Sequence, residues 1–425
     1  MIKAAGRRGG ARPFWKIPVL AALVALAGVM PAGAAEPIRI GFGMALTGGL
    51  AANGKSALVA MKIWEADTNA KGGLLGRPVQ LVYYDDQSNP STVPGIYTKL
   101  LDVDKVDLVV GGYATNMLAP AMPVIIQHNV TFLGLFGLAV NSEFHYPNYF
   151  AMVPSGPKPK IEFSKGFFDV AMAQTPKPQT IAIVAADAEF ARNAADGARE
   201  NAKAAGLKIV YDRTYPPSTV DFSSIVKSVQ AVDPDILYVG SYPPDTAGMV
   251  RAMNEIGLHA KICCGGMVGL QSAALKTQLG PMLNGIIDYD FWLPAPTMQF
   301  PGVMELLEKY QAQAASEGVD LLGYYMPPYA YADLQVLGEA IQETKSLDQA
   351  KLAAYMREHT FKTVVGDVKF GEGGEWASGR VLQVQFQHVK GNDVEQFKNP
   401  ATQVIVAPAK YESGKVIYPW ASAKQ

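Results

Sequence analysis

Cysteine, charge and long hydrophobic runs are all scarce in this sequence of 425 residues. Two cysteines are too few for a disulfide scaffold. The 37 basic and 38 acidic side chains give a net charge of -1, which leaves no basic field for a nucleic acid. Charged residues make up 18% of the chain and hydrophobic residues 49%, so a disordered chain is excluded. The length predicts two or three globular domains with large cores.

The most apolar segment lies near the N-terminus. Residues 1–34 contain five basic residues and no acidic one, and an apolar run from Ile17 to Met30 precedes the small residues up to Ala35. This order is typical of a secretory signal peptide, and the run is short for a membrane span of about 20 residues. We expect export and cleavage after Ala34 or Ala35, and an uncleaved anchor is the alternative. Cleavage would leave 32 basic and 38 acidic residues, a net charge of -6.

Beyond this segment, short β-branched runs alternate with helical patterns. The first series predicts strands at 38–44, 79–84, 107–111 and 130–135, with helices at 56–70, 92–103 and 118–128. The second series predicts strands at 180–185, 207–211, 236–240 and 261–264, with helices at 189–205, 222–232 and 246–256. Such alternation is typical of doubly wound parallel sheets, and two series indicate two lobes. Irregular stretches at 149–160, 289–301 and 366–379 indicate that the chain crosses between the lobes more than once.

The loops that follow the predicted strands are candidates for a binding site, because ligands of open parallel sheets bind beyond the carboxyl ends of the strands. These loops are poor in charge and rich in glycine, hydroxyl groups and aromatic rings. Their notable side chains are Tyr113, Thr115, Asn116, Phe136, Phe190 and Tyr242. Two such edges facing each other would form an aromatic cleft for a small, partly apolar ligand. The alternative is that these rings only pack beneath the loops.

One catalytic motif matches in full. Residues 49–56 satisfy G-x-x-x-x-G-K-[ST], in which Lys55 would contact phosphates and Ser56 a magnesium ion. Four residues separate this motif from the predicted strand, and an exported protein meets little ATP, so we interpret it as a glycine-rich turn. The five histidines have no metal-ligand spacing. We expect no enzymatic activity, cofactor or metal; an exported α/β enzyme or NTPase that uses this loop is the alternative.

Three pairs of polar or reactive residues need an interpretation. We interpret Asp85-Asp86 and the pair Asp288 and Asp290 as solvated carboxylates. Cys263 and Cys264 are adjacent, which permits a vicinal disulfide in an oxidising compartment. Two buried thiols at the end of a strand are the interpretation that we favour.

Several segments of the mature chain resemble one family. They are Ile38–Gly48, Asn69–Gly76, Tyr83–Asp86, Val109–Thr115, Thr180–Val184 and Asp235–Tyr242. Their order and spacing are similar to those of periplasmic solute-binding proteins of ABC importers, of the leucine/isoleucine/valine-binding type. The resemblance implies a type I periplasmic binding protein: an α/β chain of two Rossmann-like lobes, joined by three hinge crossovers, that closes on its ligand.

The resemblance also implies boundaries and partners. Lobe 1 would comprise 36–153 and 289–366, and lobe 2 with the tail 154–288 and 367–425. The partners would be a small-molecule ligand and an ABC permease of the inner membrane, with no nucleic acid, and we expect a periplasmic monomer. A ligand sensor with the same fold, which signals to a membrane receptor, is an alternative.

The ligand-binding residues follow from the resemblance position by position. Thr115 matches a hydroxyl that receives the ligand carboxylate, Phe190 and Tyr242 match aromatic walls, and Asn53 falls where the family often has an aromatic residue. The predicted ligand-binding set is Asn53, Tyr113, Thr115, Asn116, Phe136, Gly137, Leu138, Phe190, Tyr242, Gly266 and Met267.

One departure from the family concerns the ligand. In the amino-acid binders an acidic residue follows the strand predicted at 261–264 and holds the ligand ammonium, whereas this chain has Gly265, Gly266 and Met267. Burying an ammonium without a partner costs free energy. We therefore predict a small hydrophobic or aromatic carboxylate. Asp187 or Asp245, from other loops, would keep an amino acid possible.

Overall fold

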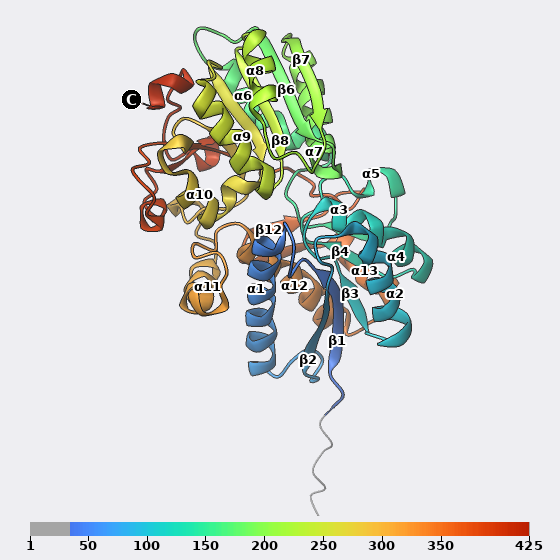
Figure 1. The fold of residues 1–425 in the computed structure, drawn as a ribbon. Helices are drawn as coiled ribbons and strands as arrows, with labels where there is room; N and C mark the ends of the chain where they lie inside the picture. Colours follow the sequence, from blue (N-terminus) through green and yellow to red (C-terminus); the bar gives the residue numbers. More distant parts are fainter. Residues whose placement is uncertain (1–34, 425) are drawn as a thin grey trace, which may run out of the picture. The chain divides into compact units, whose positions relative to one another are not determined.

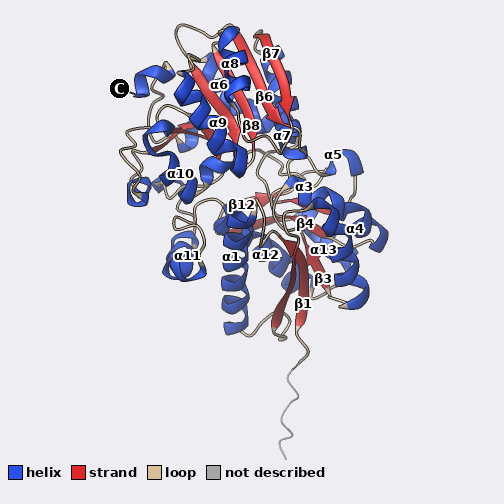
Figure 2. Ribbon diagram, in the orientation of Figure 1, coloured by secondary structure: helices blue, strands red, loops and turns tan. Residues whose placement is uncertain are grey.

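The computed structural model describes residues 35–424, so the predicted signal peptide lies outside the described residues. Strands in this part of the chain form two large sheets and one hairpin (Figures 1 and 2). The first sheet has five parallel strands in the order β2-β1-β3-β4-β5. These are β1 (Ile38–Met44), β2 (Val79–Asp85), β3 (Leu108–Val110), β4 (Phe132–Gly134) and β5 (Tyr149–Ala151).

The second sheet has seven strands in the order β14-β13-β10-β9-β8-β6-β7. The five strands from β10 to β7 are parallel, and β13 and β14 extend the β10 edge in antiparallel fashion. The strands are β6 (Thr180–Ala186), β7 (Lys208–Tyr215), β8 (Ile236–Ser241), β9 (Ile262–Met267), β10 (Ile287–Asp290), β13 (Leu382–Phe386) and β14 (Gln403–Ala407).

The strand β1 illustrates why these segments form buried strands. Alternate residues of a strand point to opposite faces of the sheet. Ile38, Ile40 and Phe42 share one face and are fully buried. Gly41 and Gly43 lie on the other face, where a Cβ on Gly41 would come within 2.9 Å of a Val106 methyl group. The absence of side chains at these two glycines therefore lets the following elements pack closely against the sheet.

Helices flank both sheets (Figure 2). Those that follow strands of the first sheet are α1 (Ala51–Ala70), α2 (Val93–Thr98), α3 (Thr115–Leu118), α4 (Met122–His128) and α5 (Asn141–Phe144). Those of the second series are α6 (Pro159–Met172), α7 (Glu189–Ala204), α8 (Ser223–Ala231), α9 (Pro243–Ile256) and α10 (Ala273–Leu279).

Three later helices return to the first sheet. They are α11 (Val303–Glu317), α12 (Met326–Thr344) and α13 (Gln349–Glu358). Asp67 of α1 pairs with Lys309 of α11 at 2.8 Å and accepts a hydrogen bond from the Tyr331 hydroxyl of α12 at 3.0 Å. The backbone of Thr131 donates to the Gln349 side chain at the start of α13. The first lobe is thus completed by residues far away in the sequence.

The chain passes between the two sheets three times: from β5 to α6, from β10 to α11, and from β12 to β13. The strands β11 (Thr360–Thr363) and β12 (Gly366–Lys369) form the hairpin. The first and third passages contact each other, because the Arg380 N–H donates to the Pro154 carbonyl at 2.7 Å. Two α/β lobes joined by three crossovers confirm the predicted fold class.

The structure also corrects some predictions of local structure. The stretch 149–160, predicted as irregular, contains β5 and leads into α6, which begins at Pro159. Proline is tolerated in the first turn of a helix, so the proline that suggested a loop in fact starts a helix. The stretch predicted as irregular from Tyr289 begins inside β10. Asp288 and Asp290 on this strand are buried and not solvated, and Asp86, of the other pair predicted as solvated, is buried as well.

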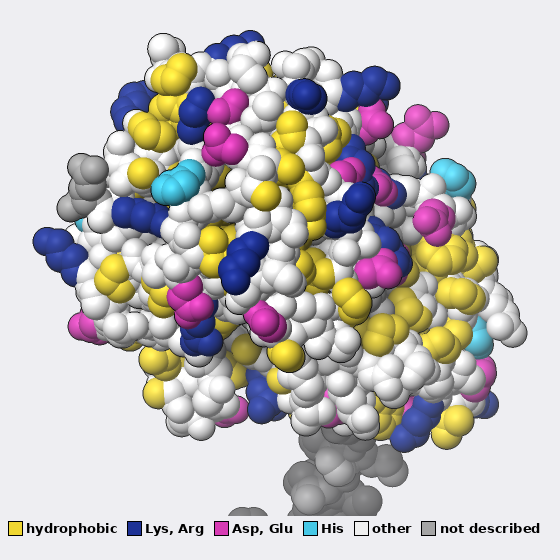
Figure 3. Space-filling model, turned by 45° about the horizontal axis from the view of Figure 1, so that its top comes forward, with side chains coloured by type: hydrophobic (Ala, Val, Ile, Leu, Met, Phe, Trp, Pro, Cys, Tyr) yellow, Lys and Arg dark blue, Asp and Glu magenta, His cyan; other side chains and the backbone are white. Residues whose placement is uncertain are grey.

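No helix within residues 35–424 has both the length and the hydropathy needed to cross a bilayer. On the face drawn in Figure 3, acidic, basic and hydrophobic side chains are interspersed. Ion pairs such as Arg199 with Asp212 at 2.7 Å join opposite charges within the second lobe.

Candidate functional site

A small cavity lies among the loops beyond the carboxyl ends of the strands of both sheets. Six of the predicted ligand-binding residues line it: Tyr113, Thr115, Phe136, Leu138, Phe190 and Tyr242. Seven further lining residues were not predicted: Ala114, Val153, Phe163, Val268, Tyr289, Phe291 and Tyr325. The cavity volume is about 30 Å³, which is on the order of the space of one water molecule. The two lobes are therefore closed around an almost filled centre.

Aromatic rings fill this centre by packing on one another. The ring of Phe136 lies 4.9 Å from that of Phe291 and 5.1 Å from that of Tyr325, measured between centroids. On the side of the second lobe, Phe163 lies 4.7 Å from Tyr289. Such centroid separations are typical of favourable aromatic pairs. A ligand that enters must replace these contacts with its own.

Two side chains from the first lobe carry hydroxyl groups whose hydrogens are not used by the described residues. The Thr115 Oγ accepts a hydrogen bond from the Leu138 N–H at 3.0 Å, which leaves its own hydrogen to donate. The Tyr113 hydroxyl accepts a hydrogen bond from the Asn53 amide at 2.7 Å, so its own hydrogen is likewise left to donate. Burial raises the pKa of Tyr113 well above its usual range, so this hydroxyl is a neutral donor at physiological pH.

The backbone before α3 is also unusual at this point. Ala114 has a φ of 88°, in a region that residues with a side chain rarely adopt. The residue lines the cavity and immediately precedes Thr115. Strained backbone of this kind gathers at ligand-contacting segments of proteins.

Two hydrogen bonds join the lobes beside the cavity. The Tyr242 hydroxyl, from the start of α9, donates to the Asn116 side chain of α3 at 3.2 Å and accepts from the Phe190 N–H at 3.1 Å. The Asn193 amide of α7 donates to the Leu138 carbonyl at 2.9 Å. These bonds hold the closed arrangement, and lobe opening must break both.

The remaining predicted residues lie outside the cavity wall. Asn53 and Asn116 support it through their bonds to Tyr113 and Tyr242. Three others do not line it: Gly137, Gly266 and Met267. A Cβ on Gly266 would lie 2.9 Å from the Tyr238 hydroxyl, so glycine there is explained by close packing.

No charged side chain of residues 35–424 lines the cavity. Asp187, which might have replaced the missing acid, is paired with Arg192 at 2.9 Å. The Asp245 carboxylate accepts from the Tyr242 N–H at 2.8 Å and from the Tyr215 hydroxyl, and it thereby caps α9. Neither acid is placed to hold a ligand ammonium.

Two buried carboxylates lie close by, on β10. Asp288 accepts from the Met267 N–H at 3.0 Å, and Asp290 accepts from the Phe291 N–H at 2.8 Å. Burial is the largest cause that raises the pKa of Asp290, to about 6, against the lowering effect of Lys276. Since alternate residues of a strand face opposite ways, both acids point away from the side on which Tyr289 meets the cavity. Their role in the structure is to bond backbone N–H groups.

The motif at residues 49–56 does not form a phosphate-binding loop. The helix α1 begins at Ala51, and the N–H groups of Asn53 and Gly54 both donate to the Leu50 carbonyl. A Cβ on Gly54 would lie 2.0 Å from the Ala45 carbonyl oxygen, which explains the glycine by packing. The Ser56 hydroxyl donates to the backbone of Ala52. Within residues 35–424, no cluster of three metal-ligating side chains is found either.

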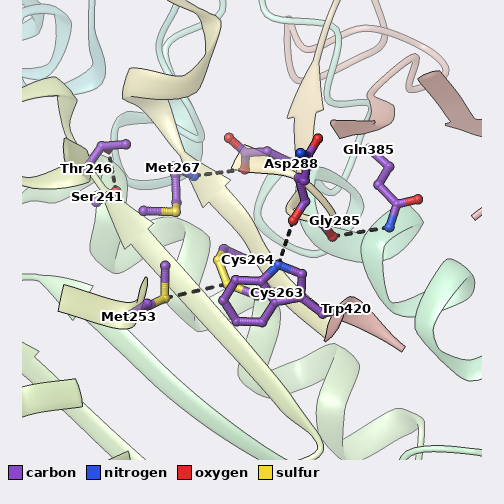
Figure 4. Close-up of a disulfide and its surroundings, with 11 residues drawn as sticks. Ser241, Thr246, Met253, Cys263, Cys264, Met267, Gly285, Asp288, Gln385 and Trp420 are labelled. Carbon is purple, nitrogen blue, oxygen red and sulfur yellow. Dashed lines mark hydrogen bonds between the residues drawn. A yellow bond between two sulfur atoms is a disulfide. The ribbon is translucent and has the colours of Figure 1, made fainter. Parts of the chain in front are cut away.

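Cys263 and Cys264 are joined as a vicinal disulfide, contrary to the interpretation as two thiols that we favoured (Figure 4). Both residues are fully buried in β9, and the Met253 sulfur lies 3.9 Å from that of Cys263. The backbone N–H of Trp420 donates to the Lys261 carbonyl just before β9. The disulfide therefore belongs to the core of the second lobe, near the beginning of β9, the strand that leads to Val268.

Comparison with known proteins identifies the family. Residues 37–391 match the model of the periplasmic binding protein family. The chain belongs to this family. Its members are solute-binding proteins, as the sequence segments had indicated.

Relatives and solved structures agree with this assignment. A Leu/Ile/Val-binding protein homolog 2 of Brucella abortus is 28% identical over 88% of this chain and 95% of its own length. The crystal structure of a periplasmic binding protein from Burkholderia mallei superposes with a TM-score of 0.74 at 19% identity, covering 91% of this chain and 99% of that one. A solute binding protein of an ABC transporter from R. palustris, solved with benzoate, has a TM-score of 0.71 at 16% identity, covering 90% and 99%.

Proposed function

We propose that the protein is the extracytoplasmic solute-binding receptor of an ABC importer, and that it traps a small aromatic or hydrophobic carboxylate between its lobes. The observation that carries this proposal is the composition of the cavity wall, which has eight aromatic residues and, within the described chain, no charged side chain. Aromatic walls suit a flat apolar body. A zwitterionic amino acid would leave its ammonium without an acidic partner, which is costly in a closed site.

The carboxylate would bind at the first lobe. Thr115 matches the family position that receives a ligand carboxylate, and its hydroxyl hydrogen is available beside that of Tyr113. Hydrogen bonds to an ionised group contribute about 1.5–3 kcal/mol each. Phe136 and Phe291 would enclose the apolar body from one side, and Phe190 and Tyr242 from the other. The relative solved with benzoate supports this choice of ligand class.

Closure of the lobes is the proposed mechanism. A cavity of about 30 Å³ does not admit a molecule of this size, because ligand sites usually measure about 300–1,000 Å³. The ligand would therefore enter an open form, in which the bonds from Tyr242 to Asn116 and from Asn193 to Leu138 are broken. Binding would shift the population back toward a closed form with the ligand inside.

The boundaries of the lobes, the location and the partner are part of the same proposal. Lobe 1 comprises 36–153 and 289–366, and lobe 2 with the tail 154–288 and 367–425. The signal peptide at 1–34 directs the chain to the periplasm, where a monomer delivers its ligand to an inner-membrane permease. No enzymatic step is proposed, since binding and release suffice for this role.

A thermal-shift screen of the purified mature chain tests the ligand class. Benzoate, 4-hydroxybenzoate and short hydrophobic carboxylates are compared with leucine and isoleucine. A ligand at 100 times its Kd stabilises the folded state by about 2.7 kcal/mol. We expect the carboxylates to raise Tm and the amino acids to leave it unchanged. If only zwitterionic amino acids raise Tm, the conclusion from the missing acid is wrong and the chain is an amino-acid receptor.

A further inference from the structure

A second, larger cavity lies at the passages between the lobes, apart from the aromatic cavity. This hinge groove has a volume of about 880 Å³. It is lined by the β11–β12 hairpin, by Ser378–Arg380 of the third passage, and by Pro408, Lys410 and Tyr411 after β14. Its volume falls within the range of small-molecule sites. Three aromatic side chains, Phe300, Trp376 and Tyr411, contribute to its wall.

Arg380 is the residue that distinguishes this groove. Its side chain lines the groove although the residue is only 8% exposed. No carboxylate of residues 35–424 lies within 4.0 Å of its guanidinium, and its Nε has no hydrogen-bond partner there. A buried cation without a counter-charge is costly, and removing the partner of a buried charge destabilises proteins strongly. The folded chain therefore carries an uncompensated positive charge at this groove.

The guanidinium is held in a fixed position. One of its Nη atoms donates to the Tyr329 hydroxyl at 3.1 Å, while the rings of Phe300 and Trp376 lie each 5.0 Å from its central carbon. The Arg380 N–H donates to Pro154, which anchors the backbone as well. Such preorganisation lowers the entropy that binding would otherwise cost. The other Nη atom makes no hydrogen bond with the described residues.

The side chains around Arg380 carry a net positive charge as well. Lys362, Lys369 and Lys410 also line the groove. Asp367, the one acidic lining residue in the described part of the chain, is paired with Lys362 at 2.7 Å. Glu375 lies next to Trp376 in the sequence, but burial raises its pKa to about 8, so it is mostly neutral at pH 7. The groove thus combines an excess of positive charge with apolar walls.

We propose that the hinge groove is a second binding site, in which Arg380 holds the carboxylate of a small organic acid and the aromatic wall holds its flat body. A guanidinium binds carboxylates through parallel N–H donors, which a lysine cannot provide. The groove and the aromatic cavity share no lining residue, although Tyr329 lies between them, since its hydroxyl accepts from Arg380 and donates to the Phe291 carbonyl at 3.1 Å. The proposal stands whether or not the aromatic cavity takes the ligand class given above.

The indole N–H signal of Trp376 in an NMR spectrum reports on the wall of the groove, and Trp376→Phe identifies that signal. Because the Tyr329 ring lies between Trp376 and Phe136 of the aromatic cavity, a variant of the aromatic cavity is needed to separate the two sites. Benzoate is the probe, and benzamide, of similar shape without the charge, is its control. We expect benzoate to shift the signal in the wild type and benzamide not to. The shift should persist in Thr115→Val, which weakens the aromatic cavity. If it disappears in Thr115→Val, the signal arises from the aromatic cavity and the proposal is wrong.

Substitutions in the groove complete the test. Arg380→Gln should weaken benzoate binding to the groove at least about tenfold, as expected for a lost charged hydrogen bond. Because Arg380 is buried, Lys410→Glu provides a second variant at an exposed groove residue, and Lys71→Glu, at the exposed end of α1, is its matched control. We expect Lys410→Glu to weaken the affinity of the groove for benzoate several-fold, as measured by titration of the Trp376 signal. Lys71→Glu should leave this affinity unchanged. Equal affinity in Lys410→Glu and wild type would overturn the proposal.

Discussion

Replacing Thr115 by valine tests the aromatic cavity most directly. Valine keeps the shape of the side chain and removes only the hydroxyl, which we expect to donate to the ligand carboxylate. A hydrogen bond to a charged group contributes about 1.5–3 kcal/mol. At 1.4 kcal/mol per tenfold change, the loss corresponds to a Kd raised roughly 10- to 150-fold. Titration calorimetry with the carboxylate identified in the thermal-shift screen measures this change.

The substitution also affects the folded protein, so it needs controls. Thr115 is buried, and its Oγ accepts the Leu138 N–H, which would lose its partner. An unpaired buried N–H costs about 1–3 kcal/mol of stability. Thr131 is a matched residue away from the cavity, because it is equally buried and its Oγ donates to the Gln349 carbonyl at 2.7 Å.

The two threonines should therefore differ in binding and not in stability. Thr131→Val is expected to lower the free energy of unfolding by a similar amount and to leave Kd unchanged. Thr115→Ser, which keeps the hydroxyl, should bind within a few-fold of the wild type. A Thr115→Val protein that binds the carboxylate as tightly as the wild type would refute the role of this hydroxyl.

Three further predictions concern closure, pH and the unused motif. Tyr242→Phe removes the hydroxyl that joins Asn116 to Phe190, at a cost of about 1–2 kcal/mol to the closed form. Small-angle scattering of the chain without ligand should then show a larger radius of gyration. An unchanged radius would contradict the proposal that this hydroxyl holds the lobes together. Glu375, with its pKa raised to about 8, stays protonated in the folded state while the unfolded state releases its proton near pH 4.3. Stability should thus fall by up to about 1.4 kcal/mol per pH unit between pH ~4.5 and 8, and urea unfolding of Glu375→Gln should lack this slope; identical slopes would show that the carboxyl is not buried as an acid. Lys55→Ala should leave ligand affinity unchanged, whereas ATP hydrolysis that depends on Lys55 would revive the NTPase alternative.

The strand pattern was enough to predict the part of the cavity that follows strands. Tyr113 and Thr115 come after β3, and Phe136 and Leu138 after β4, where a parallel sheet places its ligand loops. Tyr242 and Phe190 come after β8 and β6 in the same way. For these residues, the predicted end of the preceding strand was enough to predict their position at the cavity.

The other aromatic walls could not be found by this rule. Phe163 comes from α6, Tyr289 and Phe291 from β10 and the passage after it, and Tyr325 from the residue before α12. Proline and glycine in these passages masked the regular structure, and no local pattern indicates which part of a crossover faces the ligand. Only the tertiary arrangement of the lobes brings these residues to the cavity. The burial of Asp288 and Asp290 was missed for the same reason, because the neighbours that bury them are remote in sequence.

The packing of the rings in the aromatic cavity has a consequence for ligand choice. Its rings already contact one another, so a ligand gains only the difference between its own contacts with Phe136 and Phe291 and those that it displaces. A flat aromatic body can replace a ring-to-ring contact with one of similar geometry, whereas a flexible aliphatic chain also loses rotamer freedom on burial. The neutral hydroxyls add to this preference, because they can bind a carboxylate and offer no charge to an ammonium. Ring packing and polarity therefore favour the same class of ligand, although they act on different parts of the molecule.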